Sequence, residues 1–416
     1  MPVPRPLASG KLIALSRSLV KPAGGMQKVL VLDANQRSAL AVIRSLGRHG
    51  LKVIAADHRA YPLGAASKYA TTSVRYPDPA LSPGAFVKEI IALADRLGID
   101  LIVPASDLTT MLLASQSDLS KTRRMATPRA DSYEILTDKA RLMELAGKLA
   151  IPVPETHLAH TRPAIVDAAH NLGFPVVLKP ARSRYLKGDR IFSTGVEIVH
   201  STEDLSGTLS SQEWLGDIPC LVQRFVPGHG AGVFVLYGPH GPLAWFAHRR
   251  LREKPPMGGV SVLSESTPAN PVMQTVADKL LSAANWTGVA MVEFRVAGDG
   301  TAYLMEVNGR FWGSLQLAID SGVDFPWLLY QLIQNRPATA PPSYVVGRRL
   351  RWLLGDLDSL IIELRDTSSS LGDRSRALAA FVRSFADTGC RQEIFRLNDP
   401  KPAVIESLQW CRQIIK

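Results

Sequence analysis

The sequence predicts a mixed fold: an α/β domain built on a parallel sheet, then an α+β domain and a helical C-terminal segment. Three observations lead to this prediction. Short apolar runs alternate with helical patterns in the first third of the chain, hairpin-like strand pairs dominate the middle, and apolar residues at helical spacing fill the end. A chain of 416 residues also exceeds the roughly 250–300 residues that one core serves, so we expect two or three domains.

Composition is typical of a globular protein. Hydrophobic residues make up 46% and charged residues 20% of the sequence, which excludes disordered and fibrous classes. The sequence contains no apolar run of about 18 residues, so no membrane span is expected. Cys220, Cys390 and Cys411 are far apart and odd in number, which argues against a disulfide framework and against a zinc site. We therefore expect a cytoplasmic protein.

The first 26 residues are rich in basic residues. Arg5, Lys11, Arg17 and Lys21 precede the first acidic residue, Asp33. We predict that residues 1–26 form a disordered basic tail, with a transit peptide as the alternative.

Residues 27–130 have the pattern of a doubly wound parallel sheet. The expected elements are strands at Val29–Leu32, Val53–Ala56 and Leu101–Val103, and helices at Ser38–His49 and Phe86–Leu97. This alternation of strand and helix is typical of α/β domains. The turn after the first strand, Asp33 to Arg37, contains no glycine, so it does not predict an NAD or FAD site.

Residues 131–335 are predicted to form an α+β domain. A helix at Asp138–Ala150 leads into the connector Ile151–Pro154. Strands are then expected at Pro175–Lys179, Gly195–Val199, Cys220–Val226, Val233–Tyr237, Leu243–His248, Val289–Val296 and Thr301–Val307. Residues 336–416 are interpreted as a linker, Pro337–Pro342, and a helical C-terminal segment.

An acidic pair stands on a predicted hairpin. An Asp299-Gly300 pair separates the two strands, and Asp-Gly is a favoured two-residue type I′ loop. Counting back from that loop places Glu293 opposite Glu306, with Asn308 on the same face. Val292, Phe294, Met305 and Val307 would then face the core.

Two opposed carboxylates repel each other, and a divalent cation would remove that repulsion. Two carboxylates and an amide oxygen are hard ligands suited to Mg²⁺, which also takes phosphate oxygens. The alternative is a solvated polar face in which Arg295 forms an ion pair.

Two lysines and an arginine-rich segment could bind anions. Lys179 ends a Pro-flanked strand, and Lys139 begins a helix with Thr137 as the expected N-cap. A lysine there opposes the helix dipole unless that end holds an anion such as phosphate. Ordinary surface lysines are the alternative. Arg249, Arg250 and Arg252 precede a Gly-Gly loop in Pro255–Ser261, a pattern that would suit an anion; a solvated basic hairpin end is the alternative.

Two further segments complete the candidate site. Gln223–Gly228 lies at the end of a predicted strand, which Pro227 and Gly228 terminate. The backbone of this strand end could hydrogen-bond a flat heterocycle. The alternative is a core strand that leads into a turn. Arg310 lies just past the predicted metal ligands, where it could stabilise a developing oxyanion.

In this order, these pieces resemble the ATP-grasp superfamily over roughly Lys28 to Gln334. The most specific part is the acidic pair together with Glu306-Val307-Asn308-Gly309-Arg310. Arg249–Ser261 and Asn398–Pro402 are similar to carboxylate–amine ligases related to the ATP-binding half of carbamoyl-phosphate synthase. The resemblance implies a pre-ATP-grasp domain at residues 27–130 and a two-lobed ATP-grasp domain at 131–335 with its hinge near 223–226.

The resemblance also implies roles for the candidate residues. Lys139 and Lys179 would contact ATP phosphates, and Arg310 would face an acyl phosphate, with Arg249 and Arg252 as further catalytic candidates. The adenine would be held by Gln223, Arg224, Phe225 and Val226. One or two Mg²⁺ ions, or Mn²⁺, would be bound by Glu293, Glu306 and Asn308.

The chain departs from the family pattern in two places. The loop 181–194, expected to cover the phosphates, has Gly188 as its one glycine and carries the basic residues Arg182, Arg184, Lys187 and Arg190. An acidic residue is common in the family where Arg224 stands. These departures affect how the lid closes and how adenine and ribose are held.

The expected activity is ATP-dependent ligation of a carboxylate to an amine through an acyl phosphate, with ADP and phosphate released. The alternatives are a bicarbonate- or carbamate-phosphorylating enzyme and a non-catalytic nucleotide- or nucleic-acid-binding protein. Expected partners are a small carboxylate and an amine such as amino acids, without nucleic acid or membrane; a homodimer is left open. The net charge of +11 is accordingly interpreted as serving small anions.

Overall fold

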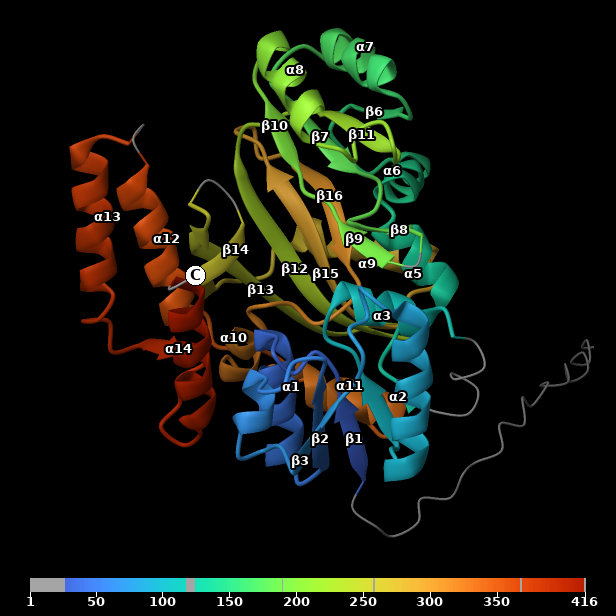
Figure 1. Ribbon diagram of the computed structural model, residues 1–416, viewed down its shortest axis with the longest axis vertical. Helices are drawn as coiled ribbons and strands as arrows, with labels where there is room; N and C mark the ends of the chain where they lie inside the picture. The colour runs from blue at the N-terminus through green and yellow to red at the C-terminus, as the bar shows by residue number, and fades with distance from the viewer. Residues whose placement is uncertain (1–26, 117–123, 189, 257–258, 367–368, 415–416) are drawn as a thin grey trace, which may run out of the picture.

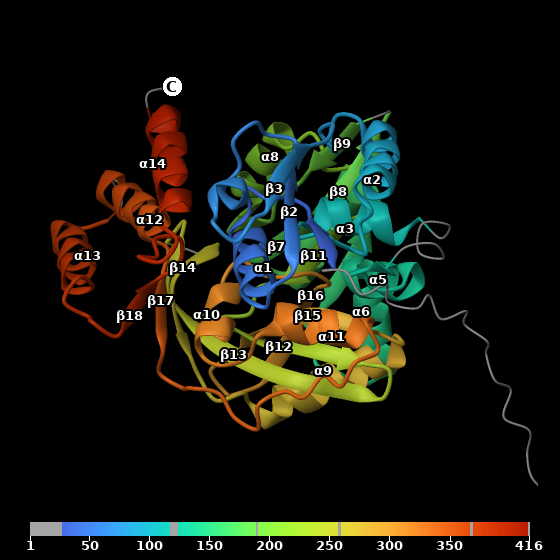
Figure 2. The ribbon, with the colours of Figure 1, turned by 90° about the horizontal axis from the view of Figure 1, so that it is seen from below.

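A computed structural model describes residues 27–116, 124–188, 190–256, 259–366 and 369–414. The predicted basic tail, residues 1–26, lies outside the described residues. Figure 1 shows a large antiparallel sheet in the middle, with an α/β unit below it, a smaller lobe above it and the last helices at one side. Figure 2, seen from below, shows these last helices beside the α/β unit.

The N-terminal α/β unit (Lys28–Met125) is a five-stranded parallel sheet. Its strands lie in the order β3-β2-β1-β4-β5, which confirms the predicted fold class of this part. The strands are β1 (Lys28–Val31), β2 (Lys52–Asp57), β3 (Thr72–Arg75), β4 (Leu101–Val103) and β5 (Arg124–Met125), and the helices are α1 (Arg37–Arg48), η1 (Leu63–Ala66), α2 (Pro83–Leu97) and α3 (Asp107–Ala114).

The order of these strands places a switch point between β1 and β4. The chain runs from β1 outward to β2 and β3 and then returns to β4 on the other side. The N-terminal ends of α1 and α3 therefore open at the same edge of the sheet, where α/β folds bind ligands. Ser106 caps α3 by accepting a hydrogen bond from the Thr109 N–H.

The small lobe (Thr156–Arg224) is a four-stranded antiparallel sheet covered by two helices. Its strands lie in the order β10-β7-β11-β6, and it follows the helical pair α5 (Ala130–Thr137) and α6 (Lys139–Lys148). The elements are β6 (Thr156–Ala159), α7 (Arg162–Leu172), β7 (Val176–Pro180), β10 (Glu197–Val199), α8 (Thr202–Ser211) and β11 (Cys220–Arg224), with a separate hairpin of β8 (Arg184–Lys187) and β9 (Arg190–Ser193).

The large sheet has seven strands in the order β16-β15-β12-β13-β14-β17-β18. Its first five strands are β12 (His229–Gly238), β13 (Gly241–Lys254), β14 (Val260–Ser266), β15 (Gly288–Val296) and β16 (Ala302–Asn308), with α9 (Pro271–Ala283), α10 (Leu315–Asp320) and α11 (Phe325–Ile333). One buried cluster joins Phe234 and Trp312 to α1 and α11 residues, so this sheet and the N-terminal unit share a core.

The hairpin that carries the acidic pair corrects the predicted loop. Ala297 donates to the Thr301 carbonyl at 3.0 Å, so residues 298–300 form a three-residue loop rather than a two-residue one. Gly300 supplies the positive φ of +86° that this turn requires. A bulge at Met305 then shifts the register back, so that Glu293 still lies opposite Glu306.

The same bulge changes which residues face the core. Phe294 lies opposite Leu304, and both are buried, whereas Met305 is only half-buried. Val292 and Val307 are buried as predicted. The prediction that Met305 faces the core was therefore wrong. Met305 is the extra residue of the bulge in β16, and Leu304 occupies the core position opposite Phe294 instead.

The C-terminal segment is less purely helical than predicted. It contains α12 (Leu353–Arg365), α13 (Leu371–Arg383) and α14 (Lys401–Ile414), but also β17 (Arg349–Arg351) and β18 (Cys390–Gln392), which complete the large sheet. Asp399 lies in the tail of this segment and accepts hydrogen bonds from Arg44, Ser67 and the Lys68 N–H of the N-terminal unit. The segment is thus anchored to the N-terminal unit.

Candidate active site

Two carboxylates and an amide converge at the paired strands β15 and β16. Glu293 and Glu306 lie directly opposite each other. The Asn308 Nδ2 atom donates to Glu293 Oε1 at 3.0 Å and to Glu306 Oε1 at 3.1 Å. One oxygen of each carboxylate therefore faces the same point between the strands. The sequence-predicted ligand set is brought together.

The surroundings of this pair disfavour two negative charges. Burial, and then the charge of Glu306, raises the pKa of Glu293 to about 7. Arg250 offsets part of this effect because its Nη2 atom donates to Glu293 Oε2 at 3.0 Å. On the other side, the Lys139 Nζ atom lies 3.7 Å from Glu306 Oε2. The two carboxylates are thus held between cations.

This donor set fits Mg²⁺ as part of a larger shell. Among the described residues, no cluster of three or more acidic, histidine or cysteine side chains could hold a metal by itself. Two carboxylates and an amide supply about half of the six oxygen ligands that Mg²⁺ prefers, and phosphate oxygens and water usually complete them. Asn308 directs its NH₂ group at the carboxylates, so ligation through its oxygen requires the amide to turn over.

Lys139 lies at the first position of α6 and is only 6% exposed. Its Nζ atom donates to Ser183 Oγ at 3.1 Å. Asp138, not Thr137, caps this helix by accepting from the N–H groups of Ala140 and Arg141, which corrects the predicted cap. Thr137 instead ends α5.

Lys179 is buried inside the small lobe. It is 8% exposed, and its Nζ atom donates to Gln223 Oε1 at 2.8 Å. Gln223 is itself held by Thr156, because its Nε2 atom donates to Thr156 Oγ1 at 2.9 Å. Burial lowers the pKa of Lys179 to about 8. The predicted alternative, a lysine that extends to solvent, does not hold.

The side chains of the predicted hinge residues point in different directions. The Gln223 side chain turns inward to Lys179, whereas Arg224 is exposed and forms an ion pair with Glu155 at 2.6 Å. Arg295 donates from Nε to the Val226 carbonyl at 3.1 Å and lies over the Phe225 ring. Arg295 therefore supports the backbone of the predicted hinge. The solvated-face alternative required an ion pair between Arg295 and the acidic pair, and the described contacts of Arg295 do not include one.

Three arginines of β13 lie on two faces of the large sheet. Residues that lie opposite each other in an antiparallel pair share a face. Arg249 lies opposite Glu265 and Arg252 opposite Leu263, while Arg250 lies opposite the intervening Ser264. A register shift between Arg250 and Arg252 thus puts Arg249 and Arg252 on one face and Arg250 on the other.

The three arginines consequently have different partners. Arg249 pairs with Glu265 at 2.6 Å, and Arg252 with Asp356 of α12 at 2.6 Å. The structure does not bring either side chain to the acidic pair, so their catalytic role stays a prediction without geometric support. Arg250 does reach the site, where it contacts Glu293, although it was not among the predicted catalytic residues.

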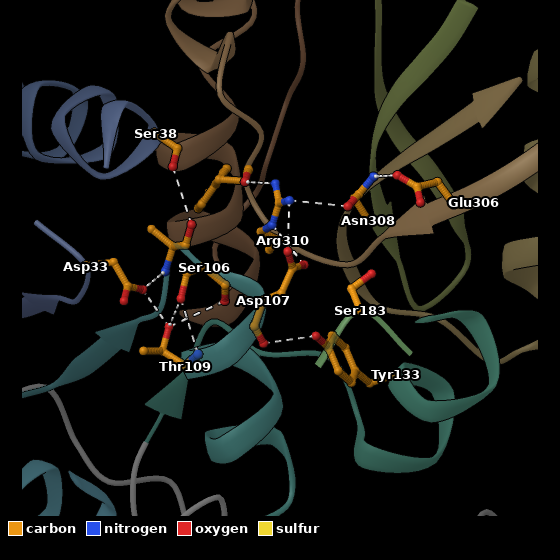
Figure 3. Close-up of polar contacts among 12 residues, drawn as sticks. Asp33, Ser38, Ser106, Asp107, Thr109, Tyr133, Ser183, Glu306, Asn308 and Arg310 are labelled. Atoms are coloured by element: carbon orange, nitrogen blue, oxygen red, sulfur yellow. Dashed lines mark hydrogen bonds and ion pairs between the residues drawn. The ribbon is translucent and has the colours of Figure 1, made fainter. Parts of the chain in front are cut away.

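Arg310 is held between β16, which carries the candidate ligands Glu306 and Asn308, and the N-terminal unit. Its Nε and Nη2 atoms donate to the two carboxylate oxygens of Asp107 at 2.9 and 3.0 Å. Nη2 also lies 3.3 Å from Asn308 Oδ1, and Nη1 donates to the Phe311 carbonyl. Figure 3 shows Arg310 between Asp107 and Asn308. Asp107 lies 203 positions away in sequence, and no sequence motif indicated it.

The predicted lid contains the hairpin β8–β9. Tyr185 stacks on Phe192 across this hairpin, and the Ile191 N–H donates to the Ala80 carbonyl of the N-terminal unit at 2.8 Å. Arg182, which precedes the hairpin, donates to Asp138 Oδ2 at 2.8 Å. The basic segment is therefore attached at both ends to elements that surround the site.

Comparisons with known proteins are consistent with this architecture. Residues 217–355 match the model of a family described as "ATP-grasp in the biosynthetic pathway with Ter operon". The carbamoyl phosphate synthase large chain of Archaeoglobus fulgidus is 28% identical over 216 residues, which cover 50% of this chain and 19% of that relative. The chain therefore spans about a fifth of the length of that relative.

Solved structures share the fold. A biotin carboxylase from Campylobacter jejuni, solved as a β-γ-ATP complex, has a TM-score of 0.60 and 19% identity over 78% of this chain and 74% of its own. An L-amino acid ligase from Bacillus licheniformis has a TM-score of 0.58 and 16% identity over 74% of each chain. Among the described residues, no helix is long and apolar enough to cross a membrane. Residues 217–355 are thus similar in sequence to an ATP-grasp family, and the fold over about three-quarters of the chain is similar to that of a biotin carboxylase and an L-amino acid ligase.

Proposed function

We propose that this protein is an ATP-dependent ligase that joins a small carboxylate to an amine through an acyl phosphate. The observation that carries the proposal is the convergence of Glu293 Oε1 and Glu306 Oε1 on Asn308, flanked by the buried lysines Lys139 and Lys179. Two close carboxylates among cations suit a metal–triphosphate complex, because phosphoryl transfer is mainly a problem of positioning and charge.

The site residues would divide the work as follows. Glu293, Glu306 and Asn308 would hold Mg²⁺, which when bound neutralises charge on the phosphate oxygens. Lys139 and Lys179 would contact phosphate oxygens, and the hinge backbone near 223–226 would receive the adenine. Arg310 would face the transferring phosphoryl group.

The reaction would have two steps that balance. An oxygen of the substrate carboxylate attacks the γ-phosphorus, the bond to the β,γ-bridging oxygen breaks, and ADP leaves. The nitrogen of a neutral amine then attacks the acyl carbon, phosphate leaves with the electrons of the broken C–O bond, and the nitrogen loses a proton. Neither step requires a nucleophilic protein side chain.

A second candidate is phosphorylation of bicarbonate or carbamate. It is favoured by the similarity to a carbamoyl phosphate synthase large chain and to a biotin carboxylase. The L-amino acid ligase among the structural neighbours favours amide formation instead. Both candidates use the same metal and phosphate contacts, so the acceptor decides between them.

The test is a matrix of purified protein, MgATP, single carboxylates including bicarbonate, and single amines including amino acids. We expect one carboxylate–amine pair to stimulate ADP release and to give an amide detectable by mass spectrometry. Stimulation by bicarbonate alone would favour the second candidate. If MgATP binds but no combination stimulates ADP release, the ligase proposal is wrong.

A further inference from the structure

We propose that Asp107, contributed by the N-terminal unit, is the residue that positions Arg310 for phosphoryl transfer. This inference rests on the proposed function, because it takes Arg310 as the arginine that faces the transferring phosphoryl group. It adds a residue outside the ATP-grasp lobes to the reaction. It also implies that the site is complete only when the N-terminal unit packs against β16.

The contact between the two residues is bidentate. Two guanidinium nitrogens, Nε and Nη2, meet two carboxylate oxygens at 2.9 and 3.0 Å, the fork geometry that fixes an arginine in direction as well as in place. An arginine has five N–H donors. Among the described residues, Arg310 donates four hydrogen bonds, to Asp107, Asn308 and Phe311. One Nη1 hydrogen is therefore left for a further acceptor.

Asp107 is itself rigidly placed. It is the first residue of α3, directly after the capping residue Ser106. The buried Asp33 at the end of β1 accepts from the Ala105 N–H at 3.0 Å and from Thr109 Oγ1 at 2.5 Å. Ala105, just before Ser106 and Asp107, and Thr109, two positions after Asp107, are therefore both tied to Asp33 beside the parallel sheet.

Two other elements hold the same turn. Ser38 of α1 donates to the Ala105 carbonyl at 3.4 Å, and the Tyr133 hydroxyl of α5 donates to the Asp107 carbonyl at 3.2 Å. Figure 3 shows these contacts leading from Asp33 through the α3 turn to Arg310 and Asn308. Four hydrogen bonds from three different elements thus fix the turn that carries Asp107.

The geometry also explains why a carboxylate is used here. Arg310 contacts Asn308, which donates to both glutamates, while Lys139 and Arg250 contact Glu306 and Glu293 from the other sides. Without Asp107, Arg310 could swing toward Glu306 and occupy its carboxylate oxygens. Asp107 holds the guanidinium beside Asn308, so that the oxygens of Glu306 stay available.

The test compares Asp107→Asn with the wild type, using MgADP and MgADP with fluoroaluminate as probes. Fluoroaluminate mimics the transferring phosphoryl group, so its affinity reports whether the Arg310 guanidinium is correctly positioned, and no identified substrate is needed. We expect Asp107→Asn to bind MgADP as tightly as the wild type and to lose about 100-fold in affinity for the fluoroaluminate complex, since a misplacement of ~1 Å can cost that much.

Three further variants separate positioning from simple stabilisation. Asp107→Glu keeps the charge and should recover part of the loss. On an Arg310→Ala background, Asp107→Asn should add almost nothing, because a residue that acts through another is not additive with it. Asp131→Asn removes the carboxylate of an exposed bidentate pair with Arg129 and should change neither affinity. Thermal melting of each variant reports whether it folds.

The outcomes distinguish this inference from the proposed function. Equal affinity of Asp107→Asn and wild type for the fluoroaluminate complex would overturn the positioning role while leaving nucleotide binding intact. Equal losses for MgADP and for the fluoroaluminate complex would also overturn it, because they would show a general defect. If the wild type bound neither probe, the proposed function itself would fail, and the inference with it.

Discussion

We predict that Lys179 makes the binding of MgATP sensitive to pH, and its burial sets the direction of the effect. Burial lowers the pKa of Lys179 to about 8, because the low-polarity surroundings disfavour the charged ammonium. Triphosphate oxygens beside the ammonium would favour the charged form and raise the pKa again. Nucleotide binding should therefore take up a proton wherever the free lysine is neutral, which means above about pH 8.

The expected magnitudes follow from linkage. With a pKa of about 8, Lys179 is about half neutral at pH 8 and about nine-tenths neutral at pH 9. MgATP binding should therefore take up about 0.5 proton at pH 8 and about 0.9 at pH 9. The apparent affinity should fall about fivefold between these two pH values, because only the charged fraction binds well.

Titration calorimetry in buffers of different ionisation enthalpy measures this uptake. Lys179→Arg keeps a positive charge at both pH values, so it should remove the pH dependence even if binding is weaker overall. Lys148→Gln, at an exposed lysine paired with Glu144, should behave like the wild type. Proton uptake that is absent in the wild type, or that persists unchanged in Lys179→Arg, would refute this reasoning.

Two further predictions concern the acidic pair and the C-terminal segment. Glu306→Ala should lower Mg²⁺-dependent ATP turnover by about 100-fold or more with the fold intact, because Glu306 is 37% exposed; unchanged turnover would remove the metal assignment. Asp356→Ala should lower the free energy of unfolding by ~3–5 kcal/mol in urea denaturation, because it leaves Arg351, which is 0% exposed and 2.6 Å from Asp356, without its counterion. A loss no larger than that of Asp373→Ala, at an exposed pair with Arg376, would contradict this.

Much of the fold could be predicted because its elements carry regular apolar patterns. The alternation of apolar runs and helices indicated the parallel sheet, and Leu101–Val103 was placed at its observed bounds. Strands without an apolar run could not be predicted in this way. β17 (Arg-Leu-Arg) and β18 (Cys-Arg-Gln) are as short as β4 but mostly polar, and they become strands because β14 offers an edge to β17 and β17 offers one to β18.

The acidic pair shows how a correct contact can follow from an incorrect detail. The predicted two-residue loop was one residue too short, and the bulge at Met305 went unrecognised. The two errors cancel, so Glu293 lies opposite Glu306 as predicted. The face of Met305, which depends on the bulge alone, was predicted wrongly.

The sequence by itself determined the chemistry available to this protein: two glutamates and an asparagine at strand spacing, two lysines at element ends, and several arginines. The tertiary structure decided which of those arginines take part. Strand alternation puts Arg250 on the face of the acidic pair and Arg249 on the other, and a bulge in β13 turns Arg252 to the face of Arg249. The partner of Arg310 comes from α3, 203 residues earlier. Local patterns fix side-chain type and periodicity, but register shifts and packing between distant segments set direction and partners.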